Sequence, residues 1–178
     1  MSNLVHDLAI APLLRSLKNF DAIISKAEAY VEADTGIDEE TLVNARLYPN
    51  MRGLVFQVRV ATDTAKGAAA RLAGVELPSW ADDEETFADI HARIGKAITF
   101  LSGFEPGQFK GAESRPIHLK IGPYEFDFTG SSYIANFVMP NFYFHVVTAY
   151  DILRSQGVQI GKQDYLAHAG YAIRRTAS

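Results

Sequence analysis

Apolar residues recur every three or four positions in three long stretches of the chain, which places them on one face of an α-helix. The stretches cover residues 6–31, 49–73 and 87–101, and Gly74 and Gly103 follow the last two where a glycine commonly ends a helix. The pattern predicts three amphipathic helices. The apolar face of the first consists of Leu8, Leu13, Leu17, Phe20, Ile24 and Ala27.

Prolines and a capping residue set the expected helix boundaries. Pro12 marks a start or a bend in the first helix, because proline removes a backbone hydrogen bond. Asp38 is expected to cap a short helix, and Pro49 then suits the first turn of the second long helix. In a last long stretch, residues 132–156, Pro140 separates a short helix from the principal fourth helix.

Between the third and fourth helices the pattern changes to strict alternation. Apolar and polar residues alternate over 117–121 and 124–128, on either side of Gly122 and Pro123, which indicates a β-hairpin. A lone hairpin is marginal in water, so we expect its aromatic face to pack on the helices. The predicted fold is an all-α four-helix bundle with a small β-hairpin inserted before the last helix, forming one domain over residues 1–178.

Charge and composition exclude several classes of function. The formal net charge is −4 and no stretch concentrates lysine and arginine, which argues against nucleic acid or an anionic membrane as a partner. The chain has no cysteine, so disulfides and thiolate ligands are excluded. It shows no signal-peptide pattern and no long apolar run, so we expect a cytoplasmic protein. The acidic residues 82–85 are expected to favour the start of the third helix.

Polar residues interrupt two of the apolar helices in stripes. An unpaired buried amide costs about 1–3 kcal/mol, so the stripes are expected to meet and satisfy each other inside the bundle. Such a meeting has two interpretations, a structural hydrogen-bond network or a working site. The stripes consist of Asn50, Gln57 and Thr64 on the second helix and Asn141, His145 and Thr148 on the fourth.

The other histidines have simpler interpretations. His91 flanks the apolar face of the third helix and is expected to find a hydrogen-bond partner there. His118 lies on the polar face of the hairpin, where acidic neighbours can pair with it at the surface. His6 and His168 lie near the ends of the chain, where order is commonly poor.

Three segments carry a resemblance to a known superfamily. Pro140–His145, with the sequence PNFYFH, resembles the last bundle helix of the DinB/YfiT-like superfamily of metal-dependent enzymes. The stretch that runs from Tyr48 through Gln57 to Gly74 is similar to the second helix of that superfamily. Gly161–Tyr165, with the sequence GKQDY, is typical of a branch whose domain has no known function. The resemblance covers nearly the whole chain.

The resemblance implies a degenerate metal pocket. Superfamily members hold a divalent metal with three histidines, and these positions correspond to Gln57, Asn141 and His145. Only His145 keeps its imidazole, and side-chain amides are weak oxygen donors for zinc or nickel. We therefore expect at most a weakly bound divalent metal, zinc or nickel, at these three residues.

The sequence leaves three functional hypotheses. The first is a bundle whose former metal pocket, with Gln57, Asn141, His145 and Thr148 as pocket candidates, binds a small molecule without metal or is structural. The second is a metal-dependent hydrolase or a thiol-dependent transferase of the DinB/YfiT type, with His145 as ligand or general base. The third is an interaction protein, because aromatic residues on the fourth helix or the hairpin would suit a homodimer interface. We expect a homodimer, and the sequence identifies no substrate.

Overall fold

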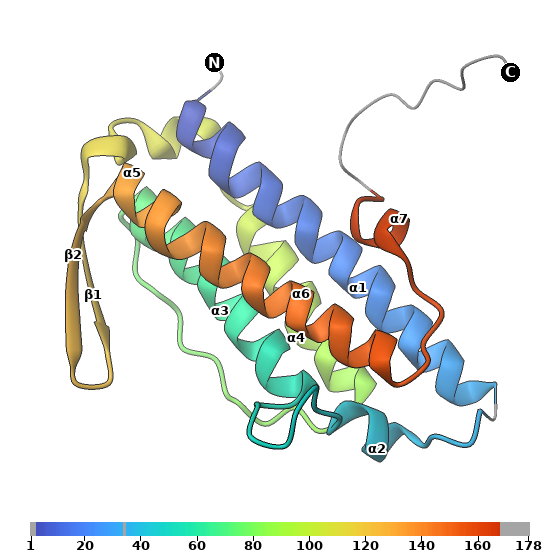
Figure 1. The fold of residues 1–178 in the computed structure, drawn as a ribbon. Coiled ribbons are helices and arrows are strands. Elements are labelled where there is room, and N and C mark those ends of the chain that lie inside the picture. The colour runs from blue at the N-terminus through green and yellow to red at the C-terminus, as the bar shows by residue number, and fades with distance from the viewer. Residues whose placement is uncertain (1–2, 34, 168–178) are drawn as a thin grey trace, which may run out of the picture.

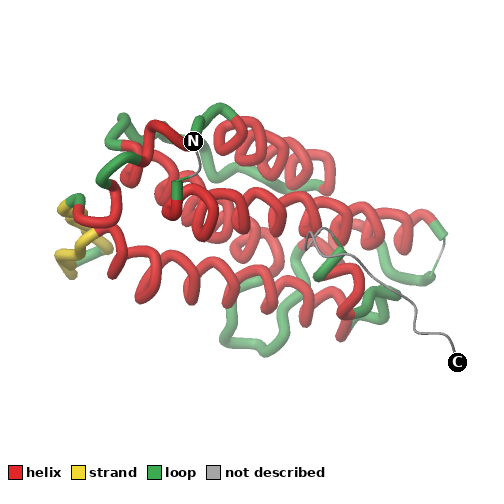
Figure 2. Tube along the Cα trace, turned by 90° about the horizontal axis from the view of Figure 1, so that it is seen from above, coloured by secondary structure: helices red, strands yellow, loops and turns green. Residues whose placement is uncertain are grey.

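Four long helices lie alongside one another and form a bundle (Figure 1). The structure is a computed structural model that describes residues 3–33 and 35–167. Helix α3 packs on both α4 and α6, and α1 packs on α4; Figure 2 shows these helices from above. The predicted all-α four-helix bundle, with a hairpin before its last long helix, is confirmed. The four helices are α1 (Ala11–Glu32), α3 (Leu54–Ala73), α4 (Phe87–Ser102) and α6 (Met139–Ser155).

The direction of the helices explains a long connection between two of them. Helices α1 and α6 run one way along the bundle, and α3 and α4 run the other way (Figure 1). Two successive parallel helices need a connection that returns along the bundle, and residues 74–86 provide it without a helix or strand of their own. Gly74 starts this connection with φ at 72°, in the left-handed region that favours glycine, as predicted.

The N-terminal helix follows the prediction except in its first turn. His6–Ile10 form a π-helical turn that continues into α1, and Pro12, in the first turn of α1, has no amide hydrogen to donate to that preceding turn. The predicted apolar face is buried from Leu13 onward. Leu8 is 63% exposed, contrary to the prediction, because the π-helical turn changes the angular spacing of the residues before α1.

Two helices begin with side-chain caps. Asp38 caps α2 (Glu39–Val43) as predicted, because its carboxylate accepts a hydrogen bond from the Thr41 amide at 2.8 Å. At the start of α4, the Thr86 hydroxyl accepts from the Asp89 amide at 3.2 Å, and the Asp89 carboxylate accepts from the Thr86 amide at 3.0 Å. This reciprocal capping box fixes the start of α4.

Helix α3 begins at Leu54 rather than at Pro49, where the sequence predicted it. Gly53 is extended, and the Leu54 amide donates to the Ala45 carbonyl at 3.0 Å instead of joining an earlier helical turn. A Cβ at Gly53 would lie 3.1 Å from the Asn44 carbonyl oxygen, so the preceding loop presses closely on the helix start. The loop is therefore held in place by backbone contacts rather than by helix.

The β-hairpin forms in the predicted register but packs only partly on the helices. Its strands are β1 (Pro116–Ile121) and β2 (Tyr124–Thr129), paired antiparallel. Phe128 contacts the ring of buried Tyr133, as predicted for an aromatic face. The tip departs from the prediction, because Tyr124 is 67% exposed and lies beyond the helices.

Short elements connect the hairpin to the bundle and close the described part of the chain. Pro140 lies in the first turn of α6, in agreement with the predicted division of the last long stretch. The end of the described chain is fixed on α1, because the Tyr165 carbonyl accepts a hydrogen bond from Asn19 at 2.8 Å. The rest of the helical turn predicted near residues 165–172 falls outside the described residues after 167. None of the described helices is long and apolar enough to cross a bilayer. The short elements are 3-10 turns at Pro106–Phe109 and Ala112–Ser114, α5 (Gly130–Tyr133), a π turn at Ile134–Val138 and α7 (Lys162–Tyr165).

Candidate functional site

The polar stripes predicted on α3 and α6 meet across the packed pair of helices. Because the two helices run in opposite directions, the residue near the start of α3 meets the residue farther along α6. Gln57 contacts His145, and Thr64 contacts Asn141. These residues are termed the α3–α6 seam. Asn50, predicted as part of the same stripe, lies instead in the exposed loop before α3.

The hydrogen bonds of Gln57 determine the tautomer of His145. Gln57 Nε2 donates to the Arg52 carbonyl at 2.9 Å, so the amide oxygen Oε1 is the atom that faces His145. Oε1 lies 2.7 Å from His145 Nδ1. An amide oxygen can only accept, so Nδ1 carries the hydrogen and neutral His145 keeps its lone pair on Nε2.

The surroundings of His145 keep its imidazole neutral. Burial lowers the pKa of His145 below its ordinary value of 6.5, because apolar surroundings disfavour the imidazolium. The rings of Phe56 and Phe144 lie edge-on, with centroids 6.1 and 5.2 Å from that of His145. Within the described part of the chain Nε2 has no hydrogen-bond partner, yet it is not sealed from solvent. The seam therefore presents one accepting nitrogen at its edge.

Asn141 turns away from His145 toward a separate hydrogen-bond relay. Asn141 Nδ2 donates to Thr64 Oγ1 at 2.8 Å, and the Thr64 hydroxyl donates to the Val60 carbonyl at 2.7 Å. Thr148, also predicted for the site, donates to the Phe144 carbonyl of its own helix at 2.7 Å. The seam thus consists of two separate relays that each end on a backbone carbonyl, and Thr148 belongs to neither.

The donor set of the seam does not fit a tightly bound metal. Of the three positions implied by the resemblance, Gln57 and His145 bond to each other, whereas Asn141 bonds elsewhere. One imidazole and two amides form a poor donor set for zinc or nickel. Across residues 3–33 and 35–167, no three side chains of His, Asp or Glu come together as a possible metal group.

A cleft of about 630 Å³ lies beside the seam and is termed the α2–α3 cleft. Its walls come from α2, the loop before α3, the first turns of α3 and residues 84–86. Phe56 lines the cleft and also contacts the His145 ring. Arg52 lines it as well, and its carbonyl accepts the hydrogen bond from Gln57. The seam and the cleft therefore share a wall.

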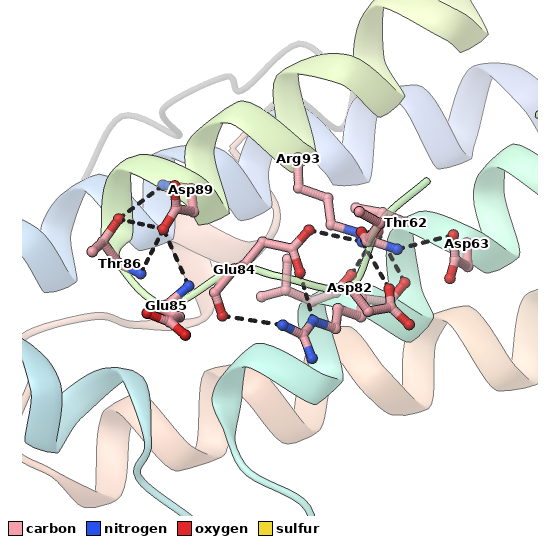
Figure 3. Close-up of polar contacts among 11 residues, drawn as sticks. Thr62, Asp63, Asp82, Glu84, Glu85, Thr86, Asp89 and Arg93 are labelled. Carbon is pink, nitrogen blue, oxygen red and sulfur yellow. Dashed lines mark hydrogen bonds and ion pairs between the residues drawn. The ribbon is translucent and has the colours of Figure 1, made fainter. Parts of the chain in front are cut away.

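On the other side of α3, sequence reasoning missed a buried ion-pair network around Arg93 (Figure 3). The Arg93 side chain is 3% exposed, and its Nη1 lies 2.9 Å from Asp82 Oδ1 and 2.7 Å from Glu84 Oε1. Its Nε donates to Thr62 Oγ1 at 2.9 Å. Nη2 lies 3.1 Å from Asp63 Oδ1, as an ion pair without hydrogen-bond alignment. The network joins α3, the long connection and α4.

Glu84 also binds a second arginine of this network, Arg59. Arg59 Nε donates to Glu84 Oε2 at 2.5 Å and Arg59 Nη2 donates to the Glu84 carbonyl at 3.1 Å. Burial pushes the pKa of Glu84 up, but hydrogen bonds from Arg93 and Arg59 outweigh it and hold the pKa below its ordinary value. Asp82 and Glu84 therefore pair with arginines, whereas the sequence predicted that residues 82–85 favour the start of the helix. One signal in the sequence could have predicted this network: Arg93 lies three residues after Ile90, on the apolar face of the third helix.

The other histidines have the predicted kinds of partner. His91 Nδ1 lies 2.6 Å from Asp21 Oδ1, and His118 Nδ1 lies 2.9 Å from Asp127 Oδ1 on the hairpin surface. His168 lies outside the described residues. These contacts give neither histidine a site role.

Comparisons with known proteins agree with the resemblance carried by Pro140–His145. Residues 5–166 match a family described as "Domain of unknown function (DUF1993)". The chain is also similar to a protein of Shewanella denitrificans whose crystal structure is described as that of a DinB family member. The two chains are 37% identical, the similarity covers 96% of each, and the TM-score is 0.87. No curated protein matches the chain significantly.

Proposed function

The chain belongs to the DUF1993 family of domains of unknown function, and from this premise we propose that it binds a small molecule without a metal ion, in the α2–α3 cleft. The observation that carries the proposal is the hydrogen-bonded chain from the Arg52 carbonyl through Gln57 to His145. It engages the Gln57 amide and His145 Nδ1, so Nε2 is the one imidazole nitrogen of His145 left as a ligand atom. It also ties the seam to the wall of the cleft.

The size of the cleft supports a small-molecule role, and its lining favours a charged molecule. Binding pockets for small molecules commonly measure 300–1,000 Å³ and combine apolar walls with a few polar groups. The α2–α3 cleft, at about 630 Å³, falls within that range. Its lining is mostly polar, because arginines and glutamates make up much of it, and Val43, Val55 and Phe56 supply the apolar surface.

Metal loading tests the first half of the proposal. The purified full chain is loaded with zinc or nickel, desalted and analysed by elemental analysis, beside His145→Ala as the matched variant. The proposal expects no stoichiometric metal in either protein, because the seam offers one imidazole. One equivalent of metal in the unsubstituted chain that disappears in His145→Ala contradicts it.

Fragment binding tests the second half. Amide chemical shifts are recorded by NMR while a mixed library of small organic molecules is added to the metal-free chain. The proposal expects shifts to gather around residues 52–59 and 84–86, the walls of the cleft. Binding that perturbs other parts of the chain and spares these residues contradicts it.

A second candidate function, hydrolysis with His145 as general base, is favoured by one specific observation. The Gln57 oxygen orients Nδ1–H, which leaves the lone pair on Nε2, the arrangement that a general base needs. An activated ester, p-nitrophenyl acetate, provides a simple probe. Turnover above background that is lost in both His145→Ala and Gln57→Leu supports this function, and equal rates in all three proteins remove it.

The expected homodimer remains a proposal that exposed aromatic side chains support. Phe144 on α6 is 59% exposed and Phe126 on the hairpin is 41% exposed. Exposed aromatic surface of this kind is common at subunit interfaces. Sedimentation of the full chain at micromolar concentration is expected to give a dimer, and a monomer there removes the proposal.

A further inference from the structure

We infer that the α2–α3 cleft recognises a short zwitterion, such as an α-amino acid or a dipeptide. This inference rests on the proposed function and names the ligand class of the same site. It follows from how charged side chains are distributed around the cleft. Arginines without an ion-pair partner line the cleft from the loop before α3, which is termed its positive end, and glutamates without one line it from α2 and the segment before α4, which is termed its negative end.

The positive end is formed by the loop before α3. The Arg52 guanidinium lies 5.5 Å from the centroid of the Phe56 ring, which holds it against the cleft wall. Arg46 Nη1 donates to the Met51 carbonyl at 3.1 Å, so the second guanidinium lies beside the same loop. Among the described residues neither arginine forms an ion pair. Guanidinium groups placed in this way suit a carboxylate, which they can bind with paired hydrogen bonds.

The negative end lies where α2 meets the start of α4. Glu39 Oε1 accepts a hydrogen bond from the Phe87 amide at 2.6 Å, which joins these two elements. Glu40 follows Glu39 on α2, and Glu85 lies two residues before Phe87, so both border this junction, and both line the cleft. Their carboxylates form no ion pair with any described residue. Two acids beside one cavity suit an ammonium group.

The remaining two charged residues of the lining add no net charge. Arg59 and Glu84 both line the cleft, but they bond to each other. A ligand with one charge would satisfy one end of the cleft and leave the charges at the other end unmatched. A short molecule with a carboxylate and an ammonium satisfies both ends, and its body lies against Val55 and Phe56.

The test titrates the metal-free full chain with three matched peptides, followed by NMR and calorimetry. Alanyl-alanine carries both charges, its N-acetyl derivative carries only the negative charge, and its C-terminal amide carries only the positive charge. We expect alanyl-alanine to perturb the amides of the cleft and each capped peptide to bind at least about tenfold more weakly, a difference that calorimetry resolves.

Substitutions assign each charge to its end of the cleft. In Arg52→Gln the preference for alanyl-alanine over its amide is expected to disappear, and in Glu85→Gln the preference over the N-acetyl derivative is expected to disappear. The controls Arg15→Gln on α1 and Glu113→Gln before the hairpin remove the same charges outside the cleft and are expected to keep both preferences.

The outcomes separate this inference from the function on which it rests. Equal binding of alanyl-alanine and either capped peptide overturns the zwitterion and leaves metal-free binding of another molecule in place. Absence of binding by all three peptides also overturns it. Stoichiometric metal at His145 overturns the proposed function instead, whatever the peptides do.

Discussion

Helix α3 buries polar side chains on two sides, and the two sides meet the cost of burial differently. Toward α6 the groups are neutral, and each relay ends on a backbone carbonyl at Arg52 or Val60. Toward α4 they are charged, and positive and negative groups balance. The charged groups are Arg59, Lys66 and Arg93 against Asp63, Asp82 and Glu84.

The difference shows which side of α3 can change without loss of the fold. The charged side depends on the buried pair Arg93 and Glu84, because removing either one leaves the other as a desolvated charge with fewer partners. A neutral relay loses about one hydrogen bond when a member changes. The α6 side also keeps a free lone pair on His145 Nε2. Substitutions on this side can therefore add or remove a binding group with little loss of unfolding free energy. The α4 side holds the wall of the cleft in place.

Breaking the charged side is expected to have the largest effect. Arg93→Met removes the guanidinium that Glu84, Asp82 and Asp63 surround, at a position 3% exposed. Glu84, whose side chain is 8% exposed, then loses one of its two arginine partners, which is expected to cost about 3 kcal/mol of unfolding free energy. Asp82 and Asp63 are 62% and 42% exposed, so water can solvate them after the substitution. Urea denaturation followed by circular dichroism measures the change.

Lys18→Met is the matched control for this substitution, because it removes a charge from an exposed position on α1. It is expected to change stability by less than about 0.5 kcal/mol. A cost below about 1 kcal/mol for Arg93→Met contradicts the view that the network depends on buried Arg93.

Restoring imidazoles on the neutral side is expected to have the next largest effect. Gln57→His together with Asn141→His places three histidines at the positions that the resemblance implies for metal ligands, and Gln57 and His145 already lie 2.7 Å apart. Zinc present at a hundred times its dissociation constant is then expected to stabilise the fold by about 2.7 kcal/mol. Thermal unfolding with and without zinc measures this gain.

The single substitution Gln57→His is the control for the gain of zinc binding. With two imidazoles it is expected to show a smaller zinc effect than the double variant. Equal stabilisation of the unsubstituted chain by zinc contradicts the conclusion that amides at Gln57 and Asn141 prevent tight binding.

The sequence was sufficient for the part of the site that follows from helical periodicity. The spacing of Gln57 and Thr64, and of Asn141 and His145, placed each pair on one helix face, and burial of those faces brings the pairs together. The sequence could not predict which residue of α3 bonds to which residue of α6. The contact of Asn141 with Thr64 depends on how far the two helices are offset along their axes. Periodicity also placed Asn50 on α3, since the tertiary contact between Leu54 and Ala45 that ends the loop has no local signal.

Helical periodicity could not predict the cleft or the charged network, and the reason is different. Both depend on residues 74–86 returning along the bundle, which follows from the relative direction of α3 and α4. The acidic residues 82–85 fit a helix start by local rules, and Asp89 does cap α4. Only the folded chain brings Glu84 to Arg59 and Arg93.

The two sides of α3 are also expected to lose stability in different ranges of pH. Burial lowers the folded-state pKa of His145, so its contribution is complete above the ordinary value of 6.5 and is lost as pH falls through and below it. Glu84, whose folded-state pKa is held below 4.5 by its arginines against the effect of burial, keeps its contribution above 4.5 and loses it at lower pH.

Unfolding free energies measured from pH 7.5 to 3 separate these two contributions. His145→Gln can keep the bond to Gln57 but cannot titrate, so it is expected to flatten the profile just below pH 6.5 only. Glu84→Gln is expected to flatten it below pH 4.5 only. A profile that His145→Gln leaves unchanged contradicts the neutral buried imidazole.

The smallest effect is expected at Thr148, and it tests where the seam ends. Among the described residues its hydroxyl bonds only to the Phe144 carbonyl of its own helix, so Thr148→Val keeps the shape of the side chain and removes no hydrogen bond between these helices. The change in unfolding free energy is expected to stay below about 0.5 kcal/mol. Thr64→Val, the same substitution within the seam, removes the acceptor of Asn141 and is expected to cost about 1 kcal/mol. Equal costs at the two positions would mean that the relay between Thr64 and Asn141 contributes nothing, and that the contrast between the two sides of α3 rests on His145 and Gln57 alone.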